Sequence, residues 1–285
     1  MAAHHGAVAS TLVEEQHRAE LAPPPGGLGI ELRGVAKAYP LGRGRSLTAL
    51  EGVDLSVAPG GFTALLGPSG CGKSTILRMV AGLDQPDAGT VAVGGRSPGE
   101  LARAHRLGVA FQDHALLPWL SVADNVALPF RLARRPVDRD RVDELVRLVG
   151  LGGFERARPR QLSGGMRQRA SIARALALDP DVLLLDEPFG ALDAVTRRRL
   201  NVELRHIWEQ RRTTTLMVTH DVTEAVFLAD QVVVLAGRPG RVAAARPVGF
   251  AERGAGLLSA PAFHAVADDL SRLLDCTAGD EPVRL

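Results

Sequence analysis

The pattern of apolar and polar positions switches repeatedly between a period of two, typical of strands, and a period near 3.6, typical of helices. Segments with strand character lie at residues 30–39, 50–57, 62–66, 90–93, 108–111, 182–185, 214–218 and 231–235. Segments with helical character lie around residues 76–82, over much of 113–178, and at about 194–211, 222–229 and 262–274. Because the two kinds of segment alternate, we predict an α/β fold with a mostly parallel sheet and helices on its faces.

Composition divides the chain into three parts. Residues 1–27 mix Ala, His and Glu and end in a Pro- and Gly-rich run, so we expect a disordered leader followed by a stiff linker. Residues 28–250 carry the alternating pattern and form the expected main domain, with a helical subdomain inserted at about 113–178. Residues 251–285 form a short tail with one predicted helix.

Charge and composition narrow the possible partners. The 34 Lys and Arg residues nearly balance the 32 Asp and Glu residues, and the net charge of +2 gives no reason to expect nucleic-acid binding. No apolar run approaches the roughly 20 residues of a membrane helix, so any membrane role is expected to come through a partner. Only two lysines occur, Lys37 and Lys73. We expect a solvated side chain for Lys37.

A phosphate-binding motif surrounds Lys73. Residues 67–74 read Gly-Pro-Ser-Gly-Cys-Gly-Lys-Ser and fit the Walker A pattern, here called the P-loop, between an apolar strand and a helix. Its glycines let backbone N–H groups face phosphate oxygens, and the helix N-terminus adds positive potential. The Lys73 ammonium is expected to reach the terminal phosphates, and the Ser74 hydroxyl to bind Mg²⁺.

Three further side chains follow apolar strands and fit the same chemistry. Asp186 and Glu187 end the strand at 182–185, and His220 follows the strand at 214–218. We expect Asp186 to bind Mg²⁺ and Glu187 to orient or deprotonate the attacking water, because phosphoryl transfer depends mainly on positioning and charge stabilisation. A neutral His220 imidazole at this edge could hydrogen-bond the γ-phosphate and respond to its loss.

A second glycine motif selects a family. Residues 162–169 read Leu-Ser-Gly-Gly-Met-Arg-Gln-Arg, where Ser163 suits a helix N-cap and the two glycines allow close approach of a phosphate. Together with the P-loop, this signature segment resembles the ATP-binding cassette (ABC) family over about residues 28–245. Met166 replaces the Gln that is commonest in that family, whereas the Ser-Gly-Gly part is intact.

The resemblance implies ATP and Mg²⁺ as ligands, an antiparallel β subdomain and an inserted ABC helical subdomain beside a P-loop NTPase core. It matches Tyr39 to the aromatic that stacks on adenine, Gln112 to the Q-loop, Asp193 to the D-loop and His220 to the switch histidine. The residues expected to bind ATP are Tyr39, Gly67, Pro68, Ser69, Gly70, Cys71, Gly72, Lys73, Ser74, Thr75, Ser163, Gly164, Gly165 and Asp193. Those expected to act in catalysis are Glu187, His220, Gln112 and Lys73, and those expected to hold the metal are Ser74, Gln112 and Asp186.

The same resemblance implies partners. In this family two cassettes pack head to tail, so that each ATP lies between one P-loop and the other subunit's signature. The segments at 114–126, 186–194 and 237–242 are similar to ATPases of nitrate, sulfonate and taurine importers. A separate permease and an extracytoplasmic solute-binding protein are then implied, with this chain peripheral on the cytoplasmic face of the membrane.

Two alternatives to that importer subunit stay open. The chain could be the ATPase of another ABC importer or exporter class, or a soluble ABC ATPase without a transport role, although the stretch from Gln112 to Leu162 is too short for a long coiled coil. The segment Leu-Leu-Pro-Trp ending at Trp119 also has two interpretations. It could form a hydrophobic docking patch for the permease, or Trp119 could pack inside the helical subdomain.

Overall fold

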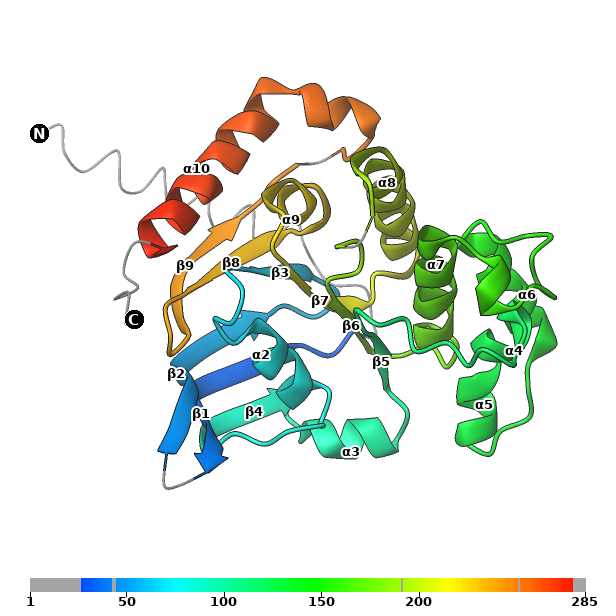
Figure 1. Cartoon of the computed structure of the whole chain (residues 1–285), viewed down its shortest axis with the longest axis horizontal. Helices are drawn as coiled ribbons and strands as arrows, with labels where there is room; N and C mark the ends of the chain where they lie inside the picture. Colours follow the sequence, from blue (N-terminus) through cyan, green and yellow to red (C-terminus); the bar gives the residue numbers. More distant parts are fainter. Residues whose placement is uncertain (1–26, 43–44, 191, 251, 279–285) are drawn as a thin grey trace, which may run out of the picture.

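The protein is described by a computed structural model that covers residues 27–42, 45–190, 192–250 and 252–278. The predicted leader lies, except for residue 27, outside the described residues. The described chain forms a six-stranded sheet, a three-stranded antiparallel sheet on one side of it and a lobe of short helices on the other (Figure 1). The predicted α/β fold is therefore confirmed.

The six-stranded sheet supplies the edge at which the catalytic side chains gather. Its strands run in the order β5-β6-β7-β3-β8-β9, and all neighbours are parallel except β8 and β9. The strands are β3 (Phe62–Leu66), β5 (Leu107–Ala110), β6 (Val182–Asp186), β7 (Thr214–Thr219), β8 (Gln231–Ala236) and β9 (Arg241–Pro247). Since parallel strands share one carboxyl edge, the residues that follow β3, β6 and β7 lie close together.

Both faces of this sheet are covered, which explains why its strands are continuous apolar runs. Along β3, Phe62, Ala64 and Leu66 pack into a core with α8 (Ala194–Arg211), α9 (Val222–Leu228) and α10 (Pro261–Ala278). Leu65 points to the other face and packs into a core with α2 (Lys73–Val80). The alternation along one strand thus joins two separate cores.

The three-stranded sheet has the order β2-β1-β4 and extends the second core. Its strands are β1 (Ile30–Gly42), β2 (Arg45–Val57) and β4 (Ala88–Val93), all paired antiparallel. Val35, Val53 and Val93 are completely buried against the α2 side of the molecule. The β1–β2 hairpin extends beyond the part of β1 that pairs with β4 (Figure 1).

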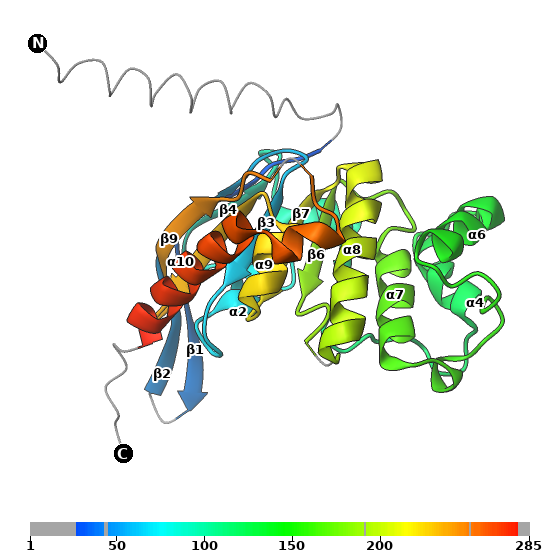
Figure 2. The same cartoon turned by 90° about the horizontal axis from the view of Figure 1, so that it is seen from above.

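The helical lobe is built from short, capped helices. Ser121, Asp138 and Ser163 each accept a hydrogen bond from the backbone N–H three residues later and so begin a helix. The helices are α4 (Val122–Val126), α5 (Leu128–Leu132), α6 (Arg139–Leu148), the 3-10 turn Pro159–Gln161 and α7 (Gly164–Ala175). Figure 2 shows this lobe projecting from the end of the molecule opposite to α10.

The C-terminal helix α10 packs on α9 and β8 and follows the 3-10 turn Ala255–Ser259 (Figure 2). Arg253, whose side chain is almost wholly buried, donates hydrogen bonds to the carbonyls of Val226, Phe227 and Val248. This guanidinium holds the segment before α10 against the C-terminal end of α9, where cations are favoured. Within the described ranges, no helix combines the length and hydropathy of a membrane span.

The structure corrects several expected elements. Residues 114–121, predicted to be helical, form a loop, because the Asn125 side chain bonds the backbone of Leu117, Leu120 and Ser121 and the helix begins only at Val122. The short helix α3 (Pro98–Arg103) and the strand β9 were not predicted. The predicted end of α2 is confirmed, since Gly82 lies just beyond it with a φ of +73°.

Candidate active site

The P-loop links β3 to α2 and closes on itself. A Cβ on Gly67 would lie 2.5 Å from the Leu235 carbonyl oxygen, and Gly72 has a φ of +92°, so both positions require glycine. The Lys73 ammonium donates hydrogen bonds to the carbonyls of Gly67 at 2.7 Å and Pro68 at 2.8 Å. Cys71, within the loop, has a buried side chain, and this burial raises the pKa of its thiol. The thiol therefore stays protonated and contributes packing.

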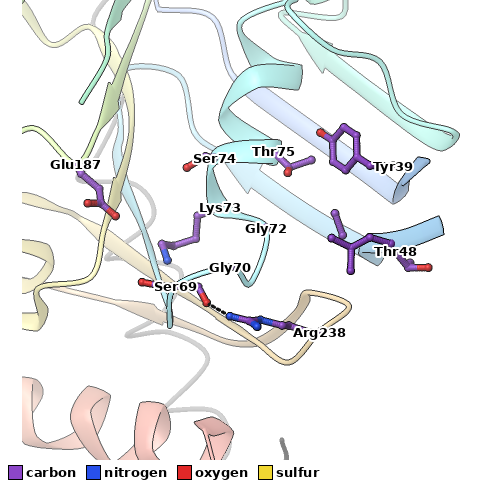
Figure 3. Close-up of a pocket in the computed structure, with 12 residues that line it drawn as sticks. Tyr39, Thr48, Ser69, Gly70, Gly72, Lys73, Ser74, Thr75, Glu187 and Arg238 are labelled. Atoms are coloured by element: carbon purple, nitrogen blue, oxygen red, sulfur yellow. Dashed lines mark hydrogen bonds between the residues drawn. The ribbon is translucent and has the colours of Figure 1, made fainter. Parts of the chain in front are cut away.

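A cavity of about 520 Å³ opens over this loop (Figure 3). Its walls come from the P-loop, the β1–β2 hairpin, Glu187 and the loop between β8 and β9. The predicted site residues that line it are Tyr39, Ser69, Gly70, Gly72, Lys73, Ser74, Thr75 and Glu187. Tyr39 and Ser69, 30 positions apart in sequence, and Tyr39 and Glu187, 148 positions apart, therefore meet around a volume that suits a nucleotide.

Tyr39 stands on the hairpin side of the cavity, and Lys37 supports it. The Tyr39 hydroxyl donates a 2.7 Å hydrogen bond to Asp84, and the Lys37 ammonium bonds Asp84 at 2.9 Å, Asp87 at 3.2 Å and the Gln85 carbonyl at 2.7 Å. The Lys37 side chain is only 12% exposed. The expectation of a solvated Lys37 was wrong, because its partners come from the segment between α2 and β4.

Asp186 ends β6, Glu187 follows it, and both face the P-loop. The Ser74 hydroxyl lies 3.4 Å from an Asp186 carboxylate oxygen. Burial raises the pKa of Asp186, and the nearby Glu187 charge adds to this effect. Glu187 has a φ of +45°, an unfavourable conformation for a residue with a side chain, and its N–H donates to the Val218 carbonyl. Such strain is typical of functional positions.

Gln112 and His220 converge on Glu187 from opposite strands. The Gln112 amide donates to one Glu187 carboxylate oxygen at 3.2 Å, and Nδ1 of His220 lies 3.5 Å from the other. Gln112 follows β5 and His220 follows β7, on either side of β6. The geometry thus brings together three of the four catalytic candidates, whereas Lys73 lies across the cavity in the P-loop.

The donor set at this edge fits a magnesium ion bound with a nucleotide. A hydroxyl from Ser74, a carboxylate from Asp186 and an amide oxygen from Gln112 are hard oxygen donors of the kind Mg²⁺ prefers. Across the part of the chain that the structure describes, no cluster of three or more His, Cys, Asp or Glu side chains could hold a metal alone. Phosphate oxygens would have to complete the coordination, as in other phosphoryl-transfer sites.

The signature segment lies elsewhere. Ser163 caps α7 by accepting from the Met166 N–H, and Asp193 caps α8 by accepting from the Val195 and Thr196 N–H groups. The bond from Thr196 holds the pKa of Asp193 below its usual value. Neither residues 163–165 nor Asp193 is among the described residues that line the cavity. One chain alone therefore does not bring these residues to its own nucleotide site.

Sequence reasoning missed three positions on β2 and one on the loop before β9. Leu47, Thr48 and Ala49 form part of the cavity wall, and no motif marks them. Arg238 also lines the cavity, and its guanidinium donates to the Ser69 carbonyl at 2.7 Å (Figure 3). The segment around Arg238 was noted only as a subfamily resemblance, although its Gly-Arg-Pro-Gly composition indicates a tight turn.

Comparison with known proteins agrees with this geometry. Residues 50–190 match the family model described as ABC transporter. The chain is 49% identical over 208 residues to the aliphatic sulfonates import ATP-binding protein SsuB of Bacillus subtilis (strain 168), covering 73% of this chain and 80% of that protein. It is also 49% identical over 209 residues to the nitrate import ATP-binding protein NrtD of Synechococcus elongatus, covering 72% and 75%.

A solved structure shares the fold. It is a dimeric ATP-binding cassette in a post-hydrolysis state bound to ADP and Pi, with a TM-score of 0.69 and 34% sequence identity. The match covers 78% of this chain and all of that chain.

Proposed function

Because the chain belongs to the ABC transporter family as an ATP-hydrolysing cassette, we propose that it energises the import of a small anionic solute, an aliphatic sulfonate or nitrate. The observation that carries the substrate class is the 49% identity to one sulfonate and one nitrate import subunit. The ATP chemistry rests on the arrangement of Gln112, Glu187 and His220 opposite the P-loop.

The P-loop binds the phosphates. Backbone N–H groups of the loop and of the first turn of α2 face the phosphate oxygens, and the Lys73 ammonium exchanges its carbonyl partners for the terminal phosphates. Bound Mg²⁺, held by Ser74, Asp186 and Gln112, would neutralise phosphate charge. Tyr39 contacts the adenine from the hairpin side of the cavity.

Glu187 then acts on the attacking water. Its carboxylate lies between Gln112 and His220, which hold it in one orientation on the γ-phosphate side of the cavity. It accepts the proton of the water as the phosphoryl group leaves. His220, half-exposed at the end of β7, donates to the γ-phosphate and loses that contact when phosphate departs.

The complete site needs a second copy of the chain. Ser163, Gly164 and Gly165 open α7 in the helical lobe, and none of them lines the cavity among the described residues. In a head-to-tail dimer each signature would supply these N–H groups to the γ-phosphate of the other subunit's ATP. ATP binding then closes the dimer and hydrolysis reopens it, which is the mechanical output.

A separate membrane permease contacts the chain at a groove beside Gln112, and the opening and closing of the dimer are transmitted to it there. A second cavity, of about 370 Å³, lies between the sheet edge at β5 and the helical lobe. Leu132 on its rim is 69% exposed, and Trp119 on the nearby loop is 66% exposed. The exposure of Trp119 favours the docking interpretation over packing inside the lobe. The chain would thus lie on the cytoplasmic face of the membrane without crossing it.

Reconstitution tests this function directly. The chain is assembled with candidate permeases from the same organism in proteoliposomes, and ATP hydrolysis is measured with candidate extracytoplasmic solute-binding proteins. We expect a binding protein loaded with a sulfonate or nitrate to stimulate hydrolysis, whereas the same protein without solute does not. Stimulation only by an uncharged solute, or ATP-driven export, would overturn the proposed substrate class or direction.

A further inference from the structure

The loop between β8 and β9, residues 237–240, lies directly on the P-loop. A Cβ on Gly240 would be 2.0 Å from the Cys71 carbonyl oxygen, so the two backbones touch and only glycine fits. On its other side, the Gly240 N–H donates to Ala49 at 2.9 Å, and its carbonyl accepts from the Glu51 N–H at 3.1 Å. The loop is therefore fixed between β2 and the P-loop.

Arg238 extends from this fixed loop to the apex of the P-loop. One terminal nitrogen of its guanidinium donates a 2.7 Å hydrogen bond to the Ser69 carbonyl (Figure 3). The same nitrogen occupies the space beside Gly70, since a Cβ there would lie 2.6 Å from it. Gly70 has a φ of +82°, which also favours glycine. The apex thus fits closely against Arg238.

The direction of one carbonyl fixes the direction of the next N–H group. In a planar trans peptide, the Ser69 carbonyl and the Gly70 N–H belong to one unit and point in opposite directions. Arg238 holds the Ser69 carbonyl and so sets the orientation of the Ser69–Gly70 peptide unit. Lys73, by contrast, bonds the carbonyls of Gly67 and Pro68 and leaves them for the phosphates when ATP binds.

We propose that Arg238 is a positioning residue for the phosphate cradle, which keeps the Gly70 N–H directed at the phosphates of ATP. The guanidinium suits this role because its donors have a fixed planar arrangement and its loop is fixed at both sides. The Arg238 side chain also lines the cavity, where its positive charge favours the anionic phosphates of ATP. The proposal rests on ATP binding by the family site and is independent of the transported solute.

Steady-state hydrolysis by the isolated full-length chain tests the proposal without a permease. We expect Arg238→Ala to raise KM for ATP about tenfold, the effect of losing a charge-assisted hydrogen bond, while kcat stays within about twofold. Arg238→Lys keeps the charge and one donor and should restore KM to within about threefold of the wild type. Arg241→Ala is the matched control, because Arg241 belongs to the adjoining strand but bonds only the exposed Glu51 among the contacts seen here.

A spectroscopic readout separates positioning from general stability. In a chain labelled with ¹⁵N-glycine, ADP should shift the Gly70 amide resonance strongly in the wild type and in Arg241→Ala, but weakly in Arg238→Ala. An unchanged KM in Arg238→Ala would overturn the proposal. A loss of kcat and of thermal stability that Arg238→Ala and Arg241→Ala share would also overturn it. Both substitutions would then act by destabilising the β8–β9 segment rather than by freeing the Ser69 carbonyl. Neither result bears on which solute is imported.

Discussion

Tyr39 and Asp84 lie 45 residues apart in sequence and are joined by a 2.7 Å hydrogen bond from the phenol to the carboxylate. Lys37 bonds the same carboxylate and lies 5.5 Å from the centre of the Tyr39 ring. Burial and the bond to Asp84 raise the pKa of the Tyr39 hydroxyl, so it stays a donor. The two lysines of the chain thus both lie at the cavity, Lys73 in the P-loop and Lys37 behind Tyr39.

Removing Lys37 should therefore weaken nucleotide binding without touching the reaction. In Lys37→Met, Asp84 loses its cation and holds the Tyr39 ring less firmly at the cavity wall. We expect the dissociation constant of a fluorescent ATP analogue to rise about three- to tenfold, as for loss of a polar contact, with kcat unchanged. Equilibrium titration measures the first quantity and saturating-ATP assays the second.

Arg33→Ala is the control for this variant. Arg33 lies on the same strand, is exposed, and pairs with its neighbour Glu31. It should bind the analogue like the wild type. If Lys37→Met and the wild type bound the ATP analogue with equal affinity, the Lys37–Asp84 pair would not support the Tyr39 ring.

Glu187→Gln should separate ATP binding from hydrolysis. The amide keeps the size of the side chain but accepts no proton from water, so we expect kcat to fall at least about a hundredfold. Binding of ATP persists, because the P-loop contacts are unchanged, and a stable dimer accumulates. Single-turnover hydrolysis and size-exclusion chromatography with ATP measure the two effects.

The control is Glu31→Gln, which removes an exposed carboxylate on β1 that does not line the cavity. It should hydrolyse ATP at the wild-type rate. Normal turnover by Glu187→Gln would exclude Glu187 as the group that activates water.

Glu224, buried one turn beyond His220, makes folding stability depend on pH. Burial raises its pKa to about 7, while the bond from the Thr219 hydroxyl lowers it. The charges that face it are Asp221, Arg197 and Glu187. An unfolded glutamate ionises near 4.5. Between these two values folding takes up a proton, so stability falls as pH rises, by at most about 3 kcal/mol for this group.

Replacing Glu224 by Gln should remove that dependence. We expect Glu224→Gln to be about 1–3 kcal/mol more stable than the wild type at pH 8 and nearly equal to it at pH 5. Urea denaturation at pH 5, 6, 7 and 8 measures the difference. Glu51→Gln, which removes an exposed carboxylate, is the control. Its free energy of unfolding should change with pH in the same way as that of the wild type. If the free energy of unfolding of Glu224→Gln also changed with pH as that of the wild type does, the raised pKa of Glu224 would be contradicted.

Local patterns allowed most of the fold to be predicted, because the parallel strands are continuous apolar runs with helices between them. β9 was missed because Arg241–Pro247 is an exposed edge strand of mostly small residues and carries little apolar signal. α3 was missed because six residues with a single buried leucine give no helical period. The loop at 114–121 was misread because the side chain that shapes it, Asn125, lies within the following helix.

The residues of the candidate site also fall into two groups, those that a local motif reveals and those that only the fold brings together. The P-loop and the carboxylates after β6 are contiguous motifs, so their residues could be named from the sequence. Lys37 and Arg238 act through partners far along the chain, at Asp84 and Ser69, and only the fold brings those pairs together. Contacts across long sequence separations have no local pattern to reveal them.

Trp119→Ala should uncouple the chain from its permease while leaving the isolated subunit intact. The side chain is 66% exposed, so its loss should cost less than about 0.5 kcal/mol of folding free energy. Basal hydrolysis should stay within twofold, because Trp119 lies outside the nucleotide cavity. In proteoliposomes, stimulation by the loaded binding protein should fall at least tenfold, since a large exposed aromatic side chain is a typical interface anchor. Leu83→Ala removes a leucine that is 64% exposed beyond α2, and it should keep full stimulation. If both variants were stimulated equally, the groove beside Trp119 would not be the permease contact.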